Sequence, residues 1–436
     1  MNGWNSQICF FVAMPLPRLL SGKVNLLKYM FLCIAGGLIF FAGVRPGWQR
    51  MQSDFPNYWL GSRLMVEQHA CDSLYHNDWF QESLRKHGFT EQGKFSPFPP
   101  PTTYLFLPLT PLPPLVAKRV WMVISLLLVA WIIWLFGRIS GMNGRDATAW
   151  VLATGLALIN NLYLGQVYLL MVAFMLYGWI QFRKGKTIVP GICFGIVAAI
   201  KYFPLVMLPE WLLKRRWKLT LSFALTITTL GLVSLYSPGV PACRDFLNRV
   251  VFAHLDGRLE GQSPFATAFQ SWNALSHRLF LFDAAENPHP WFHAPLLLQL
   301  VRHGIPALLL FFGIVHARRL ILRNASGAGV AILCLSMLVA SPASASYHLL
   351  LLLFPMALLL EDETGRSRMS PASTRLSFLL LMGIGWAPLF IGKFLAPATW
   401  PIPFQFYRLW LMLVIWLVAM RLTSHRFQVN PDRFIL

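Results

Sequence analysis

The chain has 436 residues, of which 56% are hydrophobic and only 12% are charged. Because about a quarter of the residues of a typical soluble domain are charged, this composition excludes a soluble globular protein and predicts a polytopic membrane protein. The formal net charge of +20 does not indicate nucleic-acid binding, because Lys and Arg flank apolar segments and form no basic stripe. Anionic membrane lipids and a phosphate-bearing lipid substrate are the partners that this charge favours.

A succession of apolar segments predicts an all-α membrane protein with about 12 transmembrane helices. Two of the segments are too short to cross a hydrocarbon core of ~30 Å alone. They are interpreted as short helices, tilted or partly re-entrant, that meet near Lys201. The segments are residues 29–44, 115–136, 147–162, 167–182, 188–200 and 203–213 (the last two being the short pair), then 219–236, 296–315, 327–340, 347–360, 376–391 and 404–420.

The distribution of Lys and Arg predicts how these helices are oriented. Basic runs such as RKGK at 183–186 and KRRWK at 214–218 occupy short connections, which the positive-inside rule assigns to the cytoplasm. We therefore expect a cytoplasmic N-terminal segment (1–28), a transmembrane domain (29–420) and a cytoplasmic C-terminal tail (421–436). The apolar run near the N-terminus is short and lacks a basic start, so it does not resemble a signal peptide.

Two long connections, 45–114 and 237–295, are extracytoplasmic in this orientation. They hold most of the acidic residues of the chain. Helical patterns at 58–68, 78–87 and 241–254 predict that short amphipathic helices lie within them. Polar chemistry is therefore expected on the outer side of the membrane.

No motif for a bound cofactor or metal is present. The chain has no GxxxxGK[ST], GxGxxG, HExxH or GxSxG pattern, and its six cysteines have no metal-ligand spacing. We expect no cofactor and no metal site. Cys71 and Cys243 fall in the two outer loops, where either a disulfide or two free thiols are compatible with the sequence.

Asp54 is the first acidic residue of the chain and follows the first apolar segment by ten residues. It is therefore expected near the outer membrane surface, where a carboxylate can take a proton from an acceptor hydroxyl as a general base. An alternative role is structural, because Ser53 and Asp54 precede Pro56 and a helical pattern, as helix-capping residues do. The two roles are compatible.

Lys201 is the only basic residue in the apolar stretch 188–213. A lysine at the bilayer centre costs ~2.5–3.5 kcal/mol on insertion scales, so a charge at this depth indicates function. Between two short helices, its ammonium can reach the outer surface and bind the phosphate of a lipid. The alternative is a lysine that extends its charged end to the interface without a special role.

Other polar side chains cluster at predicted outer ends of helices. The turn NNLYLGQ at 160–166 carries amides that can bind sugar hydroxyls or phosphate, or can satisfy the backbone of the turn. His348 begins an apolar segment and can bind phosphate or orient an acceptor, or can be an ordinary interfacial residue. Arg278, at the end of QSPFATAFQSWNALSHR (262–278), can contact phosphate or lipid headgroups.

The order of these motifs resembles that of glycosyltransferase family 87 over roughly residues 29–420. The family includes integral-membrane enzymes of the GT-C superfamily, among them the polyprenyl-phosphate-mannose-dependent α-mannosyltransferases of mycobacterial phosphatidylinositol mannoside synthesis. The motifs that carry the resemblance are Asp54 with Phe55 and Tyr58, Leu74-Tyr75, Phe98-Pro99-Pro100, Pro108-Leu109, Gly165-Gln166, Lys201 with Pro204, the basic-Trp segment 214–218, Gln262-Ser263, Asn273, Arg278, Ser341-Pro342 and His348.

The resemblance implies a GT-C fold and an inverting single displacement on the outer face of a bacterial inner membrane. The donor would be a hexose, mannose first, linked to polyprenyl phosphate, and the acceptor a glycolipid or a glycan of the cell envelope. Asp54 would be the general base, and Lys201 would neutralise the phosphate of the donor. His348 and Arg278 would also contact the phosphate or the lipid, whereas Tyr58, Asn160, Gln166 and Tyr347 are expected to bind substrate.

Several alternatives stay open at this point. The family usually has Asn-Gln-Ser where this chain has Gly261-Gln262-Ser263, which leaves the sugar and the acceptor undetermined. The enzyme could transfer glucose, galactose, an arabinofuranosyl group or a whole lipid-linked oligosaccharide. A lipid or solute transporter and a non-catalytic scaffold are the other classes. The absence of an internal repeat and spans nearly free of charge apart from Lys201 weigh against a transporter.

Overall fold

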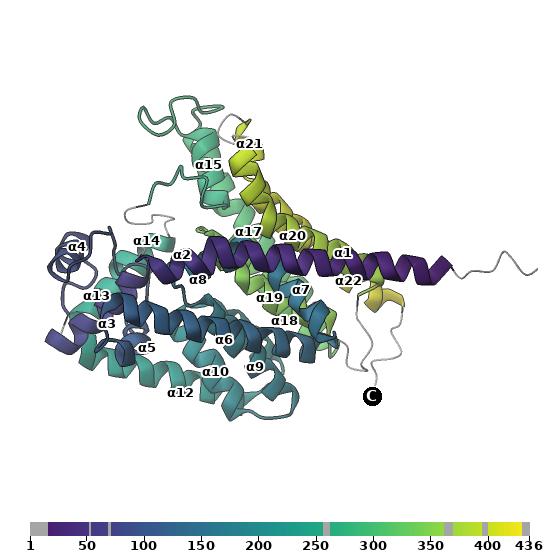
Figure 1. Ribbon diagram of the computed structural model, residues 1–436, viewed down its shortest axis with the longest axis horizontal. Helices are drawn as coiled ribbons and strands as arrows, with labels where there is room; N and C mark the ends of the chain where they lie inside the picture. Colours follow the sequence, from purple (N-terminus) through teal and green to yellow (C-terminus); the bar gives the residue numbers. More distant parts are fainter. Residues whose placement is uncertain are drawn as a thin grey trace, which may run out of the picture.

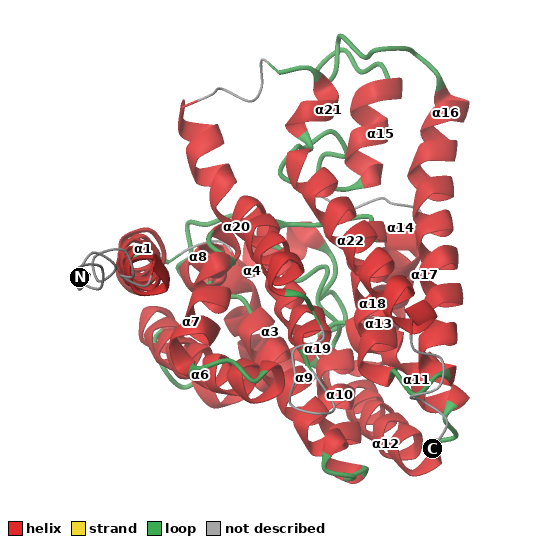
Figure 2. Ribbon diagram, turned by 90° about the vertical axis from the view of Figure 1, so that its right-hand side faces the viewer, coloured by secondary structure: helices red, strands yellow, loops and turns green. Residues whose placement is uncertain are grey.

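The computed structural model describes residues 16–51, 54–68, 71–255, 262–361, 369–394 and 400–429. These residues form a bundle of helices (Figures 1 and 2). Within the described ranges, the only β pairing is an isolated bridge between Asp283 and Asn287. The predicted all-α fold is therefore confirmed. Residues 1–15 and 430–436 of the predicted terminal segments, as well as Ser53 and Gly261, lie outside the described residues.

The helices have the following bounds. In chain order, the α-helices are α1 (Leu16–Ile39), α2 (Arg45–Gln49), α3 (Asp54–Gln68), α4 (Asn77–Lys86), α5 (Thr102–Phe106), α6 (Pro114–Ser140), α7 (Gly144–Ala153), α8 (Leu156–Leu164), α9 (Tyr168–Arg183), α10 (Ile188–Ile200), α11 (Leu208–Leu213), α12 (Trp217–Ser234), α13 (Val240–Asp245), α14 (Phe252–Leu255), α15 (Trp272–Phe280), α16 (Pro295–Gln299), α17 (Ile305–Leu322), α18 (Ser326–Ala340), α19 (Leu353–Leu360), α20 (Pro371–Phe394), α21 (Ile402–Gln405) and α22 (Tyr407–Val429). Short π-helical or 3₁₀-helical segments extend or join them: η1 (Phe40–Val44), η2 (Leu107–Leu109), η3 (Phe203–Met207), η4 (Leu235–Gly239), η5 (Phe246–Val251), η6 (Leu300–Gly304) and η7 (Ser346–Leu352).

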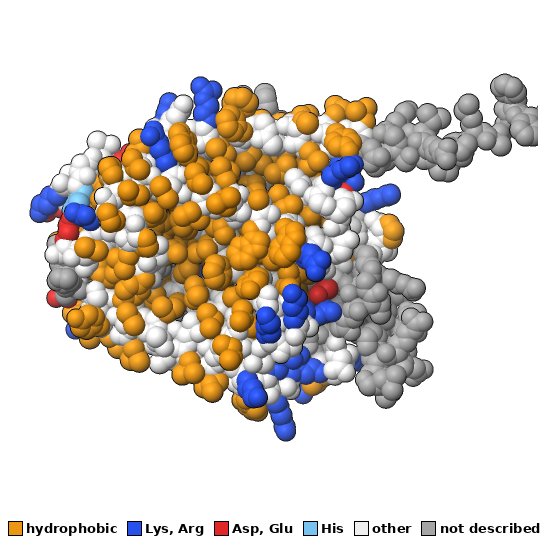
Figure 3. Space-filling view, turned by 60° about the horizontal axis from the view of Figure 1, so that its bottom comes forward, with side chains coloured by type: hydrophobic (Ala, Val, Ile, Leu, Met, Phe, Trp, Pro, Cys, Tyr) orange, Lys and Arg blue, Asp and Glu red, His pale blue; other side chains and the backbone are white. Residues whose placement is uncertain are grey.

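The apolar helices make this a multi-pass membrane protein. Within the described ranges, six helical segments are long and apolar enough to cross a membrane, or seven if α7 and α8 count as one broken span. The shorter apolar helices α9, α10, η3–α11, α18 and η7–α19 complete the bundle. Figure 3 shows a broad apolar surface with Lys and Arg side chains around its margins, the distribution expected of a protein embedded in lipid. The helix bounds do not test the predicted domain limits at residues 29 and 420, which stay predictions.

The segment predicted as one span at 147–162 is broken, which corrects that prediction. Helices α7 and α8 meet at an angle of 77° around Gly155. At this point α20 crosses so closely that a Cβ atom on Gly155 would lie 2.5 Å from the carbonyl oxygen of Gly385. The Trp386 indole donates a hydrogen bond of 3.0 Å to the Leu152 carbonyl, which also accepts one of 3.1 Å from the Gly155 N–H at the break. The sequence pattern missed the break because both halves are apolar.

The short pair predicted around Lys201 is confirmed as two helices with a break. Helix α10 ends at Ile200, and Lys201 itself is extended, with φ −154° and ψ 131°. Pro204 lies in the first turn of η3, where its missing N–H group is not needed for helical hydrogen bonding. The break places the lysine at the junction of two helices instead of on a helix face.

Within the first long loop, the segment that follows α4 packs against α3. The rings of Phe98 and Phe106 in this segment are buried. The ring centroid of Tyr58, in α3, lies 4.2 Å from that of Phe98 and 4.8 Å from that of Phe106. The Ser62 hydroxyl of α3 donates a hydrogen bond of 2.6 Å to the carbonyl of Thr103 in α5. The segment therefore holds α3, and the Asp54 side chain in its first turn, in a fixed position.

Candidate active site

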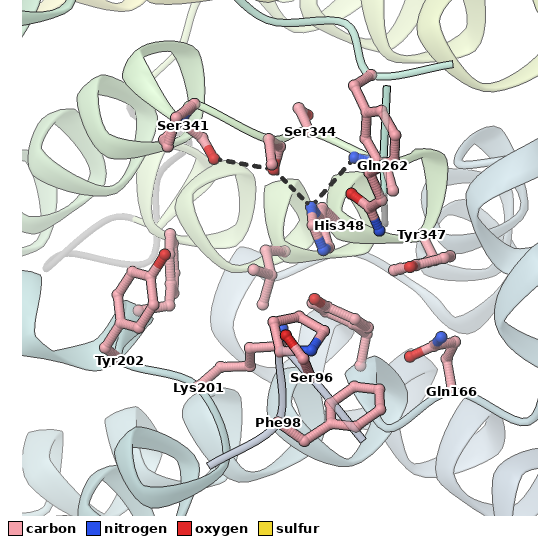
Figure 4. Close-up of a pocket in the computed structure, with 18 of the residues that line it drawn as sticks. Ser96, Phe98, Gln166, Lys201, Tyr202, Gln262, Ser341, Ser344, Tyr347 and His348 are labelled. Carbon is pink, nitrogen blue, oxygen red and sulfur yellow. Dashed lines mark hydrogen bonds between the residues drawn. The ribbon is translucent and has the colours of Figure 1, made fainter. Parts of the chain in front are cut away.

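A cavity of about 450 Å³ brings together residues from distant parts of the sequence. In Figure 4, Lys201 and Phe98 lie on one side, and His348, Ser341 and Ser344 lie on the other. Its polar lining includes Asp54, Asn57, Lys94, Gln166, Tyr168, Lys201, Tyr202, Gln262, Tyr347 and His348. Its apolar lining includes Phe98, Phe203, Phe269, Leu310, Met337, Leu338 and Leu351.

Asp54 lies in the first turn of α3, where the partial positive charge of the helix N-terminus favours a carboxylate. Its Oδ2 atom accepts a hydrogen bond of 2.8 Å from the side-chain amide of Gln166. In the part of the chain that the structure describes, no donor is bonded to the other carboxylate oxygen, Oδ1. Asp54 therefore has one oxygen held by Gln166 and one that no described donor occupies.

Gln166 is held in place by the turn that precedes it. Gly165 ends α8 with a left-handed conformation, φ 72°, which a side chain would strain. The backbone N–H of Gln166 donates to the carbonyl of Asn161 at 2.9 Å, and the Asn161 side chain donates back to the Gln166 carbonyl at 3.2 Å. Asn160 donates to the hydroxyl of Ser346 at 2.6 Å and is not among the cavity-lining residues. The turn thus uses its asparagines for structure and presents its glutamine to the cavity.

Lys201 extends into the cavity, with its ammonium 5.4 Å from the centre of the Phe98 ring. Among the described residues, none forms a hydrogen bond or an ion pair with this ammonium. Its charge attracts that of Asp54, which lines the same cavity. A half-buried cation that faces a cavity and has unused hydrogen-bond donors is suited to bind an anion.

A second lysine near Asp54 contradicts the expectation that the spans are nearly free of charge apart from Lys201. Lys118 lies on α6, within predicted span 115–136, and only 1% of its surface is exposed. Its ammonium donates a hydrogen bond of 2.7 Å to the carbonyl of Arg50, just after α2 ends, and attracts Asp54. Glu210 is a further buried charge and pairs with Arg216 at 3.1 Å. Both charges lie close to helix ends, where polar backbone groups can stabilise them.

Three aromatic rings form a cluster beside Asp54. The ring centroids of Tyr168, Tyr347 and His348 lie 4.9 to 5.3 Å apart. His348 Nδ1 is 3.1 Å from the carbonyl oxygen of Ala343 and 3.2 Å from the amide nitrogen of Ala345, so the preceding loop fixes the imidazole. The flat faces of such rings are suited to pack against a sugar ring.

Several cavity residues were not identified from the sequence. Asn57 follows Asp54 by three residues, so helical spacing places both on one face of α3, which was the available signal. The Oδ1 atom of Asn57 is buried and has no hydrogen-bond partner in the described part of the chain. The sequence offers no comparable signal for Tyr168, Tyr202 and Lys94, because only tertiary packing brings these residues to the cavity.

Three predicted site residues lie outside the cavity lining, namely Arg278, Tyr58 and Asn160. Arg278 is on α15, and its guanidinium donates to the carbonyl of Glu286 at 3.4 Å. Tyr58 is fully buried behind Gln166. The cavity therefore brings together five of the eight predicted residues, namely Asp54, Gln166, Lys201, Tyr347 and His348.

The two cysteines of the long loops are free thiols in the structure, so it does not contain the disulfide that the sequence left open. Cys71 is buried, and burial raises the pKa of its thiol to about 12. This thiol is therefore almost wholly protonated at neutral pH, which disfavours a nucleophilic role.

The arrangement as a whole places a carboxylate, a cation and an aromatic cluster around one cavity in a membrane protein. The chain matches the model of glycosyltransferase family 87 over residues 97–342, which is more than half of its length. No curated protein and no solved structure matches the chain significantly. The match confirms the predicted family and favours an enzyme over a transporter or a scaffold; Asp54, Tyr58 and His348 lie outside the matched residues. The chain belongs to glycosyltransferase family 87 and is a multi-pass membrane glycosyltransferase.

Proposed function

We propose that this enzyme transfers a hexose, with inversion, from a polyprenyl-phosphate donor to a hydroxyl of a glycolipid or cell-envelope glycan. The observation that carries the proposal is that Asp54 and Lys201 line the same cavity. A base and a cation on one cavity match the two needs of the reaction. The acceptor must lose a proton, and the leaving phosphate must be neutralised.

Asp54 has the role of general base. The acceptor oxygen forms a bond to C1 of the hexose, while the bond between C1 and the phosphate oxygen breaks. The proton of the acceptor hydroxyl moves to Oδ1 of Asp54, the oxygen that Gln166 does not hold. Polyprenyl phosphate leaves with the electron pair. Attack from the side opposite the phosphate inverts the configuration at C1.

Lys201 has the role of stabilising the leaving phosphate. A phosphate is a weak base, so it needs neutralisation of charge more than a proton from an acid. The Lys201 ammonium faces the cavity with its donors unused among the described residues, and His348 lies across the cavity from it (Figure 4). Arg278 does not line the cavity, and its predicted contact with phosphate stays a prediction.

The apolar lining supports a lipid-linked donor. Leu310 of α17, Met337 and Leu338 of α18 and Phe203 of η3 adjoin the polar residues in the same cavity. Such a surface suits an isoprenoid chain and offers no partners for the base of a nucleotide sugar. Both long loops also contribute to the cavity, through 92–98 and through Gln262 and Phe269. Because the positive-inside rule places these loops outside, we propose that the reaction occurs on the outer face of a bacterial inner membrane.

The sugar is the least determined part of the proposal. Mannose comes first because of the polyprenyl-phosphate-mannose-dependent members of the family. Glucosyl, galactosyl and arabinofuranosyl donors are the alternatives, and the polar residues of the cavity do not favour one of them.

A transfer assay with the purified protein tests the function. Radiolabelled polyprenyl-phosphate mannose, glucose, galactose and arabinofuranose are each incubated with the protein in detergent and with total bacterial membrane lipid. We expect one donor to give a labelled glycolipid, whose anomeric configuration, determined by NMR, is opposite to that of the donor. Transfer from a nucleotide sugar, retention of configuration, or no transfer from any of the four donors would contradict the proposal.

A further inference from the structure

A hydrogen-bonded chain of two side chains ends on Asp54. The Tyr58 hydroxyl donates to the side-chain carbonyl oxygen of Gln166 at 2.7 Å. The side-chain amide nitrogen of Gln166 then donates to Oδ2 of Asp54 at 2.8 Å. Of these three residues, Asp54 and Gln166 line the cavity, whereas Tyr58 does not.

The chemistry of the three groups fixes the direction of the chain. An ionised carboxylate only accepts hydrogen bonds, so the amide nitrogen of Gln166 must face Asp54. The amide oxygen must then face Tyr58, whose hydroxyl has to donate. If the Gln166 amide were rotated by half a turn, its oxygen would lie against the carboxylate of Asp54. Tyr58 disfavours that rotation, because the hydrogen bond that the Tyr58 hydroxyl donates to Gln166 would be lost.

Tyr58 is well placed to hold the amide rigidly. Its ring is fully buried between Phe98 and Phe106, at centroid distances of 4.2 and 4.8 Å. Only 1% of Gln166 is exposed, and the backbone of this residue is bonded to Asn161. Neither partner needs to reorganise when substrate enters, which is the condition for a preorganised site.

We propose that Tyr58 is a positioning residue that acts on Asp54 through Gln166. The pair occupies Oδ2 and turns Oδ1 toward the cavity, so that one defined oxygen receives the proton of the acceptor. The proposal rests on the proposed role of Asp54 as general base. It revises the expectation that Tyr58 binds substrate, and it gives Gln166 the task of orienting the base.

The test compares Tyr58→Phe, Gln166→Leu and the double variant in the transfer assay. For Tyr58→Phe we expect kcat to fall about tenfold, while KM for donor and acceptor stays within about twofold, because Tyr58 does not line the cavity. For Gln166→Leu we expect a fall in kcat of about a hundredfold. The double variant should be no slower than Gln166→Leu, because Tyr58 acts only through that residue.

Tyr104→Phe is the matched control. It also removes a tyrosine hydroxyl that donates to carbonyl oxygen, here the backbone carbonyls of Val233 (3.0 Å) and Ser237, but Tyr104 is not hydrogen-bonded to Asp54 or Gln166. We expect its kcat to stay within twofold of the wild type. Thermal unfolding in detergent verifies that each variant is folded. If Tyr58→Phe does not fold, Gln166→Leu is measured instead, and the test is whether kcat falls while KM for donor and acceptor is unchanged.

Three results would overturn the positioning role. They are a wild-type kcat for Tyr58→Phe, a raised KM with unchanged kcat for Gln166→Leu, and effects that multiply in the double variant. Each requires an active wild-type enzyme whose activity is lost in Asp54→Asn. Failure of the proposed function is distinguishable, because the wild type would then be inactive with all donors or Asp54→Asn would be active.

Discussion

Two lysines lie near Asp54, and their environments differ. Lys118 is enclosed by protein and donates a hydrogen bond to the carbonyl of Arg50, four residues before Asp54. Lys201 faces the cavity, and among the described residues it has a ring beneath it but no hydrogen-bond acceptor. Both ammonium groups attract the same carboxylate. The difference shows that a position near Asp54 does not by itself define what a lysine can do. The hydrogen-bond donors that its ammonium leaves unused also matter.

The comparison assigns the lysines to different tasks. Lys118 uses one of its donors on the carbonyl of Arg50, just after α2 ends, which is a structural contact. We propose that Lys201 keeps its donors for a ligand that carries negative charge. Substitutions of equal size at the two positions should therefore give different kinetic results.

The largest effect is expected for Lys201→Met, which keeps the length of the side chain and removes its charge. Without the cation, the developing charge on the leaving phosphate is not neutralised, so kcat/KM for the donor should fall by about 10²–10³. Thermal stability should be unchanged or increased, because the desolvation cost of a half-buried charge is removed. Steady-state kinetics with varied donor measure the effect. An unchanged kcat and KM would make Lys201 a lysine without a role in the reaction.

A smaller and different effect is expected for Lys118→Met. The carbonyl of Arg50 loses its partner in a half-buried site, which should lower the free energy of unfolding by about 1 kcal/mol. Because the segment before Asp54 is then less well held, kcat should fall about tenfold with KM for the donor unchanged. Thermal unfolding and kinetics are measured on the same preparation. A raised KM for the donor at unchanged stability would place Lys118 at the phosphate and remove the distinction.

The smallest effect is expected for Arg278→Ala. Arg278 is the cation that the sequence motifs also assign to phosphate, but it lies on α15 outside the cavity lining. We expect kcat/KM for the donor to change less than twofold. Comparison with Lys201→Met under identical conditions provides the scale. A fall of tenfold or more would show that donor binding extends beyond the cavity to α15.

Local sequence patterns predicted most of the helices. Each predicted apolar segment is helical, because long apolar runs in a bilayer must satisfy their backbone hydrogen bonds internally. The break at Gly155 was not predictable, because it depends on the close crossing of α20 more than two hundred residues later. Hydropathy does not register a contact of this kind.

The candidate site was predictable where a charge conflicts with its surroundings. Lys201 in an apolar stretch and Asp54 after the first span are such conflicts, and the structure brings both to one cavity. Lys118 was overlooked because its position close to the start of a span is usual for a basic residue. Tyr168 could not be identified, since an aromatic residue in an apolar helix is normally a core residue.

The central claim is that Asp54 is the general base, and its substitution by asparagine tests it most directly. Asp78 provides a matched control, because it also lies in the first turn of a helix, α4, but is exposed to solvent. With normal expression and unfolding temperature, Asp54→Asn should lower kcat by about 10²–10⁴, the usual contribution of a general base, and Asp78→Asn should leave it unchanged. Wild-type turnover by folded Asp54→Asn would contradict the claim.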